Sequence, residues 1–161
     1  MHDDIPDQYK HMEPVLASEK WLDQQETIGR LKHLQKRLHT TSKEKGWWED
    51  HGQLCKAVAM LDNSHDLEGS ALGNGFADLM FKMSRTMLVV TELSEAIEAL
   101  RQGDPPDDKV PEYRGFAVEL ADAVIRILDI AEQFDLPVID AIFAKADFND
   151  NRTYKHGGKA I

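Results

Sequence analysis

The 161-residue sequence has a single cysteine, no long hydrophobic run and few aromatic residues. One cysteine, Cys55, excludes an internal disulfide framework and fits a reducing compartment. The longest wholly apolar runs span only a few residues, so none is long enough to cross a bilayer. The N-terminal stretch carries acidic residues and lacks an apolar core, so we expect no signal peptide and predict a cytoplasmic protein.

Basic charge is scarce as well. The chain has 19 Lys and Arg residues against 29 Asp and Glu residues, which gives a formal net charge of −10 and a pI near 5.1. Such an acidic surface repels nucleic acid and anionic membranes, so neither is an expected partner. The same composition supplies many carboxylates for hard divalent cations.

The sequence also lacks the alternation of apolar and polar residues that is typical of strands. Apolar residues recur instead at helical spacing, which predicts helices over residues 19–45, 54–61, 76–101, 112–134 and 137–149. We therefore predict an all-α fold, a bundle of four to five helices. The wide apolar arcs of the long helices predict that oligomerisation completes this bundle, because one small chain does not cover them.

The expected organisation is a single domain over residues 19–161, preceded by an arm over residues 1–18. Residues 1–18 are polar and show no periodicity. Residues 62–75 are rich in Asn, Ser and Gly, which predicts a loop. Residues 150–161 form a basic, Gly-containing tail.

Two of the expected helices carry acidic pairs at i,i+3 spacing. Glu92 and Glu95 form the first pair, and Glu119 and Asp122 form the second. Each spacing places both carboxylates on one face of its helix. Two facing helices of this kind would form a cage of oxygen ligands suited to Mg²⁺ or Mn²⁺. Two solvated helix faces explain the spacing equally well.

The helix over residues 112–134 favours the metal interpretation. Apolar residues cover most of its circumference, and its acidic residues are confined to a narrow strip. Such a helix is central in its bundle. Acidic residues on a central helix tend to face a cleft or a metal, because burying them unpaired is costly.

The C-terminal segment reverses the charge of the chain. From Lys145 onward it has four Lys or Arg residues against Asp147 and Asp150. Cationic side chains clamp phosphoryl oxygens, and the glycines at 157 and 158 let backbone N–H groups approach an anion. A frayed basic terminus is the alternative explanation. The chain has no GxxxxGK[ST] motif, so we expect no P-loop.

In order along the chain, E-x-x-E (92–95), E-x-x-D (119–122) and K-x-x-x-N-x-x-R-x-Y-x-H-G-G-K (145–159) resemble the MazG-like nucleoside triphosphate pyrophosphohydrolases. The segment EKGWWED (44–50) is similar to the one that follows the first helix of that family. The resemblance covers about residues 30–50 and 76–159. The N-terminal extension and residues 51–75, which have the character of an insertion, depart from the simpler members of the family.

The resemblance implies Mg²⁺-dependent hydrolysis of a (deoxy)nucleoside triphosphate to the monophosphate and pyrophosphate, and assembly as a dimer or tetramer. It implies a house-cleaning role in the nucleotide pool. By position, the implied metal ligands are the acidic quartet of Glu92, Glu95, Glu119 and Asp122. The implied contacts to phosphate and sugar are Lys145, Asn149, Arg152, Tyr154 and Lys159.

The catalytic roles that follow are hypotheses. Glu95 is the first candidate to accept the proton of the attacking water, with Glu119 and Glu92 as alternatives. Trp47 and Trp48 could stack on the base, or could pack the end of the first helix onto the core. Two other functions stay open: a non-catalytic helical partner-binding protein on the same scaffold, and a pyrophosphohydrolase for another phosphorylated nucleotide.

The histidines and two other polar residues of the chain give weaker signals. His51 and Cys55 have the i,i+4 spacing of a pair of soft-metal ligands, but no second pair follows, which disfavours a metal site. His39 is expected to be an exposed polar residue of the first helix. Asp129 is either an outer partner of the acidic quartet or solvated, and the solvated state is the favoured expectation.

Overall fold

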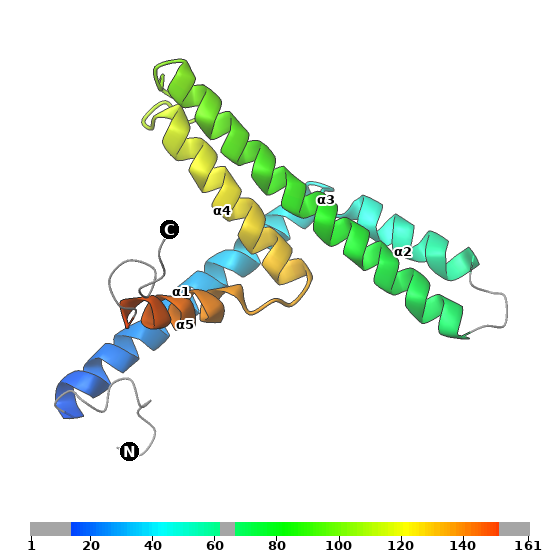
Figure 1. Cartoon of the computed structure of the whole chain (residues 1–161), viewed down its shortest axis with the longest axis horizontal. Helices are drawn as coiled ribbons and strands as arrows, with labels where there is room; N and C mark the ends of the chain where they lie inside the picture. The colour runs from blue at the N-terminus through cyan, green and yellow to red at the C-terminus, as the bar shows by residue number, and fades with distance from the viewer. Residues whose placement is uncertain (1–13, 62–66, 152–161) are drawn as a thin grey trace, which may run out of the picture. The chain divides into compact units, whose positions relative to one another are not determined.

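Helix is the predominant conformation of the chain. The computed structural model describes residues 14–61 and 67–151, and within these ranges it has helices and no strand (Figure 1). The helices are α1 (Pro14–Glu44), α2 (Glu49–Leu61), α3 (Leu67–Arg101), α4 (Gly115–Gln133) and α5 (Val138–Asp150). The all-α prediction is confirmed. Among the described helices, none combines the length and the apolar character that a membrane crossing requires.

The chain divides into two compact units. One comprises the described residues of Met1–Leu34 and Pro137–Ile161, and the other is Gln35–Leu136. In the first unit, Lys32 Nζ lies 2.7 Å from a carboxylate oxygen of Asp140, and Ile139 is buried. The second unit contains the end of α1 together with α2, α3 and α4.

Three helices begin earlier than predicted, whereas α4 begins at Gly115 and not at residue 112. α1 begins at Pro14, so residues 14–18 of the expected arm are helical; proline is well suited to a first helical position. α2 begins at Glu49, where two acidic residues favour the helix N-terminus. The loop expected over residues 62–75 is helical from Leu67 onward. A glycine costs a helix only about 1 kcal/mol, and extending a long helix is easier than nucleating a new one.

α3 and α4 form a hairpin (Figure 1). Gly103 adopts a left-handed φ of +85° and donates to the Leu100 carbonyl, while the Asp104 N–H donates to Ala99 O at 2.8 Å. This pair of bonds is a Schellman cap, which ends α3. Across the corner, a Cβ on Gly115 would lie 3.3 Å from the Ala99 Cβ, so glycine permits the close approach with which α4 begins.

Small side chains predominate among the buried apolar residues of these two helices. Ala96 of α3 is 1% exposed, and Ala123 and Ala131 of α4 are buried to a similar degree. Alanines at a helix interface let the two backbones approach closely. The hairpin corner and this alanine interface together fix the register of α3 against α4, and hence which acidic residues face each other.

Candidate functional site

The acidic pairs of α3 and α4 meet within the hairpin. Glu92, Glu119 and Asp122 each offer a carboxylate oxygen, and these oxygens all lie within 4.8 Å of one another. Glu92 is 5% exposed, whereas Glu119 and Asp122 are half-buried. Three carboxylates at this separation form a set of hard oxygen donors of the kind that Mg²⁺ binds. Three of the four predicted metal ligands are therefore brought together.

Glu95 lies at the edge of this group. Its side chain is exposed, and it is not among the carboxylates that share the 4.8 Å separation. It is close enough to raise the pKa of Glu119 by charge repulsion. With Glu119 it lines a small cavity of about 260 Å³ next to the hairpin corner. The Glu95 carboxylate therefore lies next to the clustered carboxylates, at their exposed edge.

Arg126 partly compensates the negative charge of the group. Its Nε donates a hydrogen bond to Oε1 of Glu92, and the two side chains form an ion pair. Arg126 follows Asp122 by one helical turn, so both extend from the same face of α4. The guanidinium thus contacts one carboxylate oxygen of Glu92, and the Glu92 carboxylate is also hydrogen-bonded to Glu119.

The carboxyls of α4 are electrostatically unfavourable as anions. Burial raises the pKa of Glu119, and the charges of Glu95, Glu92 and Asp122 raise it further. Burial and the Glu92 charge also raise the pKa of Asp122, although Arg126 opposes this shift. A carboxyl with a pKa raised on folding makes stability fall as the pH rises from its ordinary value through the raised one. Near neutral pH the ionised group therefore costs stability, which a bound cation would restore.

We therefore predict that Mg²⁺ raises the melting temperature at pH 7 and that Glu119→Gln removes this response. At about 100 times its Kd, the cation should add about 2.7 kcal/mol to the free energy of unfolding. Without cation, the variant should melt above the wild type at pH 7, because one of the repelling charges is gone. Differential scanning fluorimetry measures both effects. Glu112→Gln is the control, since it removes one charge from an exposed loop position.

An unchanged Mg²⁺ response in Glu119→Gln would contradict this prediction and place the cation elsewhere on the chain.

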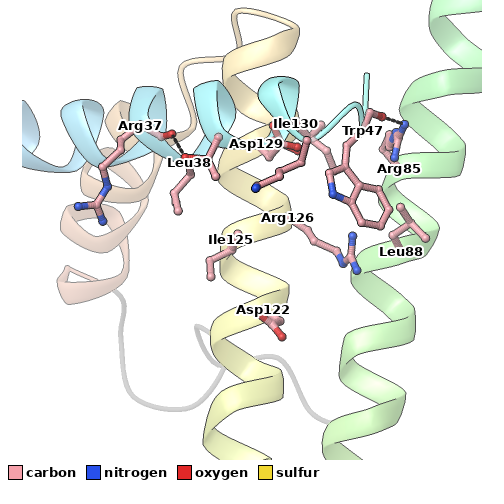
Figure 2. Close-up of a pocket in the computed structure, with 13 residues that line it drawn as sticks. Arg37, Leu38, Trp47, Arg85, Leu88, Asp122, Ile125, Arg126, Asp129 and Ile130 are labelled. Atoms are coloured by element: carbon pink, nitrogen blue, oxygen red, sulfur yellow. Dashed lines mark hydrogen bonds between the residues drawn. The ribbon is translucent and has the colours of Figure 1, made fainter. Parts of the chain in front are cut away.

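A larger pocket adjoins the carboxylate group. It has a volume of about 450 Å³ and lies between the end of α1, α3 and α4 (Figure 2). Asp122 belongs both to this pocket and to the carboxylate group. In Figure 2, Arg126 extends from α4 toward α3, between the Trp47 ring and Asp122. The cationic side chains that line the pocket are Arg37, Lys45, Arg85 and Arg126.

The pocket lining carries a net positive charge, opposite in sign to the net charge of the chain. Those four cations face only two acidic residues of the lining, Asp122 and Asp129. The chain as a whole carries a net charge of −10. A local excess of arginine in a concave site favours an anionic ligand.

The two adjacent tryptophans occupy different environments. Trp47 lines the pocket with its side chain 55% exposed, and the Arg126 guanidinium lies 5.8 Å from its ring centroid. Trp48 is 6% exposed and does not line the pocket. The guanidinium carbon of Arg85 lies 4.8 Å from the Trp48 ring centroid, and the same guanidinium donates a hydrogen bond to the carbonyl oxygen of Trp47. The structure thus brings Trp47 to the pocket and Trp48 to the core.

The Asp129 carboxylate is hydrogen-bonded to residues before and within the turn that contains the two tryptophans. Trp48 Nε1 donates to Asp129 Oδ1 at 3.0 Å, and Ser42 Oγ donates to Oδ2 at 2.7 Å. His39 Nδ1 lies 2.6 Å from Oδ1, so this nitrogen carries the proton of that bond. The predictions for two residues were wrong: His39 is 7% exposed, and Asp129 is half-buried with three partners. Spacing along one helix does not reveal partners that are 81 to 90 residues apart in the sequence.

Two of the five predicted phosphate and sugar contacts fall on described residues. Lys145 and Asn149 are on α5, in the unit that does not contain the carboxylate group. The Lys145 ammonium lies 4.5 Å from the Phe148 ring centroid. Arg152, Tyr154 and Lys159 lie outside the residues that the structure describes.

Sequence reasoning did not single out the four cations of the pocket. Arg126 gave the best available signal, because it shares the narrow polar strip of its helix with Asp122. Arg85 lies on a helix whose apolar residues dominated the interpretation. Arg37 and Lys45 lie near the end of α1, among many other charged residues.

Comparison of the chain with protein-family models, with curated proteins and with solved structures gave no match.

Proposed function

We propose that this chain is a Mg²⁺-dependent nucleoside triphosphate pyrophosphohydrolase of the MazG-like type. The observation that carries the proposal is the pocket that shares Asp122 with the carboxylate group. One wall of the combined site offers oxygen ligands for a cation. The other offers cations and an exposed indole, which suit the phosphates and the base of a nucleotide. A site with both parts fits a metal–nucleotide complex better than either ligand alone.

The carboxylates fit a hard divalent cation, because all of the clustered donors are oxygens. Glu92, Glu119 and Asp122 would hold the ion, with Glu95 at the exposed edge of the group. When bound, Mg²⁺ (or Mn²⁺) neutralises triphosphate charge and orients the attacked phosphorus. Glu95 or Glu119 accepts the proton of the attacking water.

Arg126 links the two parts of the site. In the absence of ligand, its guanidinium pairs with Glu92. A phosphate in the pocket gives that guanidinium a second anionic partner, and Arg85 and Lys45 add positive charge on the same pocket wall. Trp47 offers its exposed ring to the base. In this arrangement the cation and the phosphates bind cooperatively. The cation neutralises the carboxylates and frees Arg126 from Glu92, and the phosphates then pair with Arg126 and the cation.

The test is a panel of ribo- and deoxyribonucleoside triphosphates incubated with the full chain and Mg²⁺, with pyrophosphate and orthophosphate assayed separately. Pyrophosphate as the primary product supports attack at the α-phosphorus. Orthophosphate as the primary product contradicts it. Absence of turnover across the panel, with nucleotide binding retained, favours a binding protein on this scaffold. Turnover of a different phosphorylated nucleotide alone changes the substrate but not the site.

The apolar surface of α3 supports assembly with a second copy. Eight of its large apolar side chains are at least 43% exposed, and several follow helical spacing on the side away from the buried Glu92 and Ala96. These side chains, which we term the α3 stripe, are Leu79, Met80, Met83, Met87, Val90, Leu93, Ile97 and Leu100. A contiguous exposed surface of this kind is unfavourable in a monomer. We therefore propose a homodimer or homotetramer in which the α3 stripe is buried.

Ile97→Glu should dissociate this assembly, because it places a charge in the middle of a buried apolar contact. Light scattering coupled to size exclusion should show a mass of a dimer or more for the wild type and 18.3 kDa for the variant. Gln102→Glu introduces the same charge on an exposed residue outside the α3 stripe and should leave the mass unchanged. A monomeric wild type at micromolar concentration would show that the proposal of self-association is wrong.

A further inference from the structure

A second group of potential metal ligands lies at the other end of α3. His51 and Cys55 come from α2, and Asp78 comes from the N-terminal half of α3. Their ligand atoms all lie within 4.8 Å of one another. The sequence supplied only the His51–Cys55 pair, and folding adds the third ligand from another helix. We propose that this cluster is a binding site for a borderline-soft divalent cation, Zn²⁺, that is separate from the carboxylate group.

The separations match those of a tetrahedral zinc site. Zinc bonds of about 2.0–2.3 Å at tetrahedral angles put a nitrogen and an oxygen ligand about 3.4 Å apart, and a nitrogen and a sulfur ligand about 3.5 Å apart. His51 Nε2 lies 3.1 Å from Asp78 Oδ1 and 3.7 Å from Cys55 Sγ. The Asp78 side chain is 46% exposed, so its carboxylate can rotate to adjust the distance between its oxygen and the Cys55 sulfur.

The surroundings of His51 hold its ring in the orientation of a ligand. The centroid of the His51 ring lies 4.6 Å from that of Phe81 and 5.7 Å from that of Phe134. The His51 side chain is only 13% exposed. Its Nδ1 lies 3.4 Å from the Gln133 side-chain amide, which leaves Nε2 directed at the other two ligands. Rotation of that amide by 180° presents its oxygen to Nδ1–H. A metal-ligating histidine commonly makes a hydrogen bond of this kind from its second nitrogen.

The donor set distinguishes this cluster from the acidic quartet. One imidazole, one thiol and one carboxylate suit zinc, whereas Mg²⁺ prefers oxygen donors alone. Asp78 and Glu92 are separated along α3 by about 21 Å at 1.5 Å per residue. Three protein ligands leave a fourth position for water. A bound zinc ion would join α2 to α3 within one unit, and this inference does not depend on the proposed function.

The test uses the full chain stripped of metal by a chelator, with Co²⁺ as a spectroscopic probe. With excess Mg²⁺ present to occupy the carboxylate group, we expect one Co²⁺ per chain, a thiolate-to-cobalt charge-transfer band, and displacement of that cobalt by Zn²⁺. Cys55→Ser should abolish the band, and Asp78→Asn should weaken cobalt binding at least about tenfold. Glu119→Gln is the matched control for the carboxylate group and should leave the band unchanged.

Two results would overturn the proposal. The first is a cobalt complex without the charge-transfer band in the wild type. The second is Zn²⁺ affinity in Cys55→Ser within about twofold of the wild-type value, which would assign the ion to other histidines of the chain. Alkylation of Cys55 gives a measurement that needs no variant: Zn²⁺ should slow it at least about tenfold, and an unchanged rate contradicts the site. Far-UV circular dichroism verifies that Cys55→Ser and Asp78→Asn are folded.

Discussion

Asp122→Asn should reduce Mg²⁺-dependent release of pyrophosphate by a factor on the order of 10² or more. This side chain contributes to the carboxylate group and also lines the pocket, so in the proposed function its charge would act on the cation next to the substrate. Loss of one preorganised electrostatic contact in an active site typically costs about 10²–10³ in rate. Asparagine has nearly the same shape, so the effect should fall on turnover and not on folding.

Two further substitutions separate cation binding from proton transfer. Glu119→Gln should weaken Mg²⁺ binding and turnover together, because Glu119 lies within the clustered carboxylates. Glu95→Gln should lower turnover with a smaller change in the Mg²⁺ requirement, because Glu95 lies at the exposed edge. Steady-state rates over a Mg²⁺ titration measure both. Full activity in Glu95→Gln would transfer the role of proton acceptor to Glu119, and Glu112→Gln controls for loss of charge alone.

Trp48→Ala should lower the free energy of unfolding by about 3–5 kcal/mol, the usual cost of removing a buried aromatic side chain. The substitution leaves a cavity among His39, His51 and Phe134, which contact the indole edge to face. It also removes the indole donor to Asp129. For a chain of this size the melting temperature should fall by roughly 6–20 °C, as thermal denaturation can show.

Trp47→Ala provides the matched comparison, since it removes the neighbouring and chemically identical side chain. Trp47 is 55% exposed, so the change in stability should stay near or below about 1 kcal/mol. Its effect should fall on ligand binding instead: a lost base stack is worth about 1–3 kcal/mol, or roughly 5- to 150-fold in nucleotide Kd. Equal melting temperatures for the two variants would contradict the distinction between core and pocket.

Local patterns predicted much of the helical framework and part of the site. The spacing of Glu92 and Glu119 with their partners indicated which faces of two helices carry carboxylates, and Gly103 marked the end of α3. These features depend on residues within one or two turns of each other. The meeting of the two pairs also depends on the corner at Gly115, where the requirement for glycine comes from contact with a residue 16 positions away.

The rest of the site depends on contacts that the sequence does not encode locally. The pairing of Arg126 with Glu92 spans 34 residues, and that of His39 with Asp129 spans 90. Asp78 lies near the loop expected over residues 62–75, and nothing in its surroundings in the sequence connects it to His51. A histidine or an aspartate has the same local pattern whether its partner is water or a distant side chain. Sequence reasoning therefore placed His39 and Asp129 on the surface, although His39 is buried and Asp129 is half-buried.

The tight corner at Gly115 has a mechanical consequence for the acidic residues beyond it. Like charges on two separate helices would push those helices apart, yet here the chain turns back on itself four residues before Glu119. The short connection between α3 and α4 and the close approach of Gly115 to Ala99 keep the two helices together. The repelling carboxylates therefore stay within 4.8 Å of one another without a bound ion. The electrostatic work of bringing these carboxylates together is thus done during folding, and a cation of the proposed kind would find its ligands already assembled.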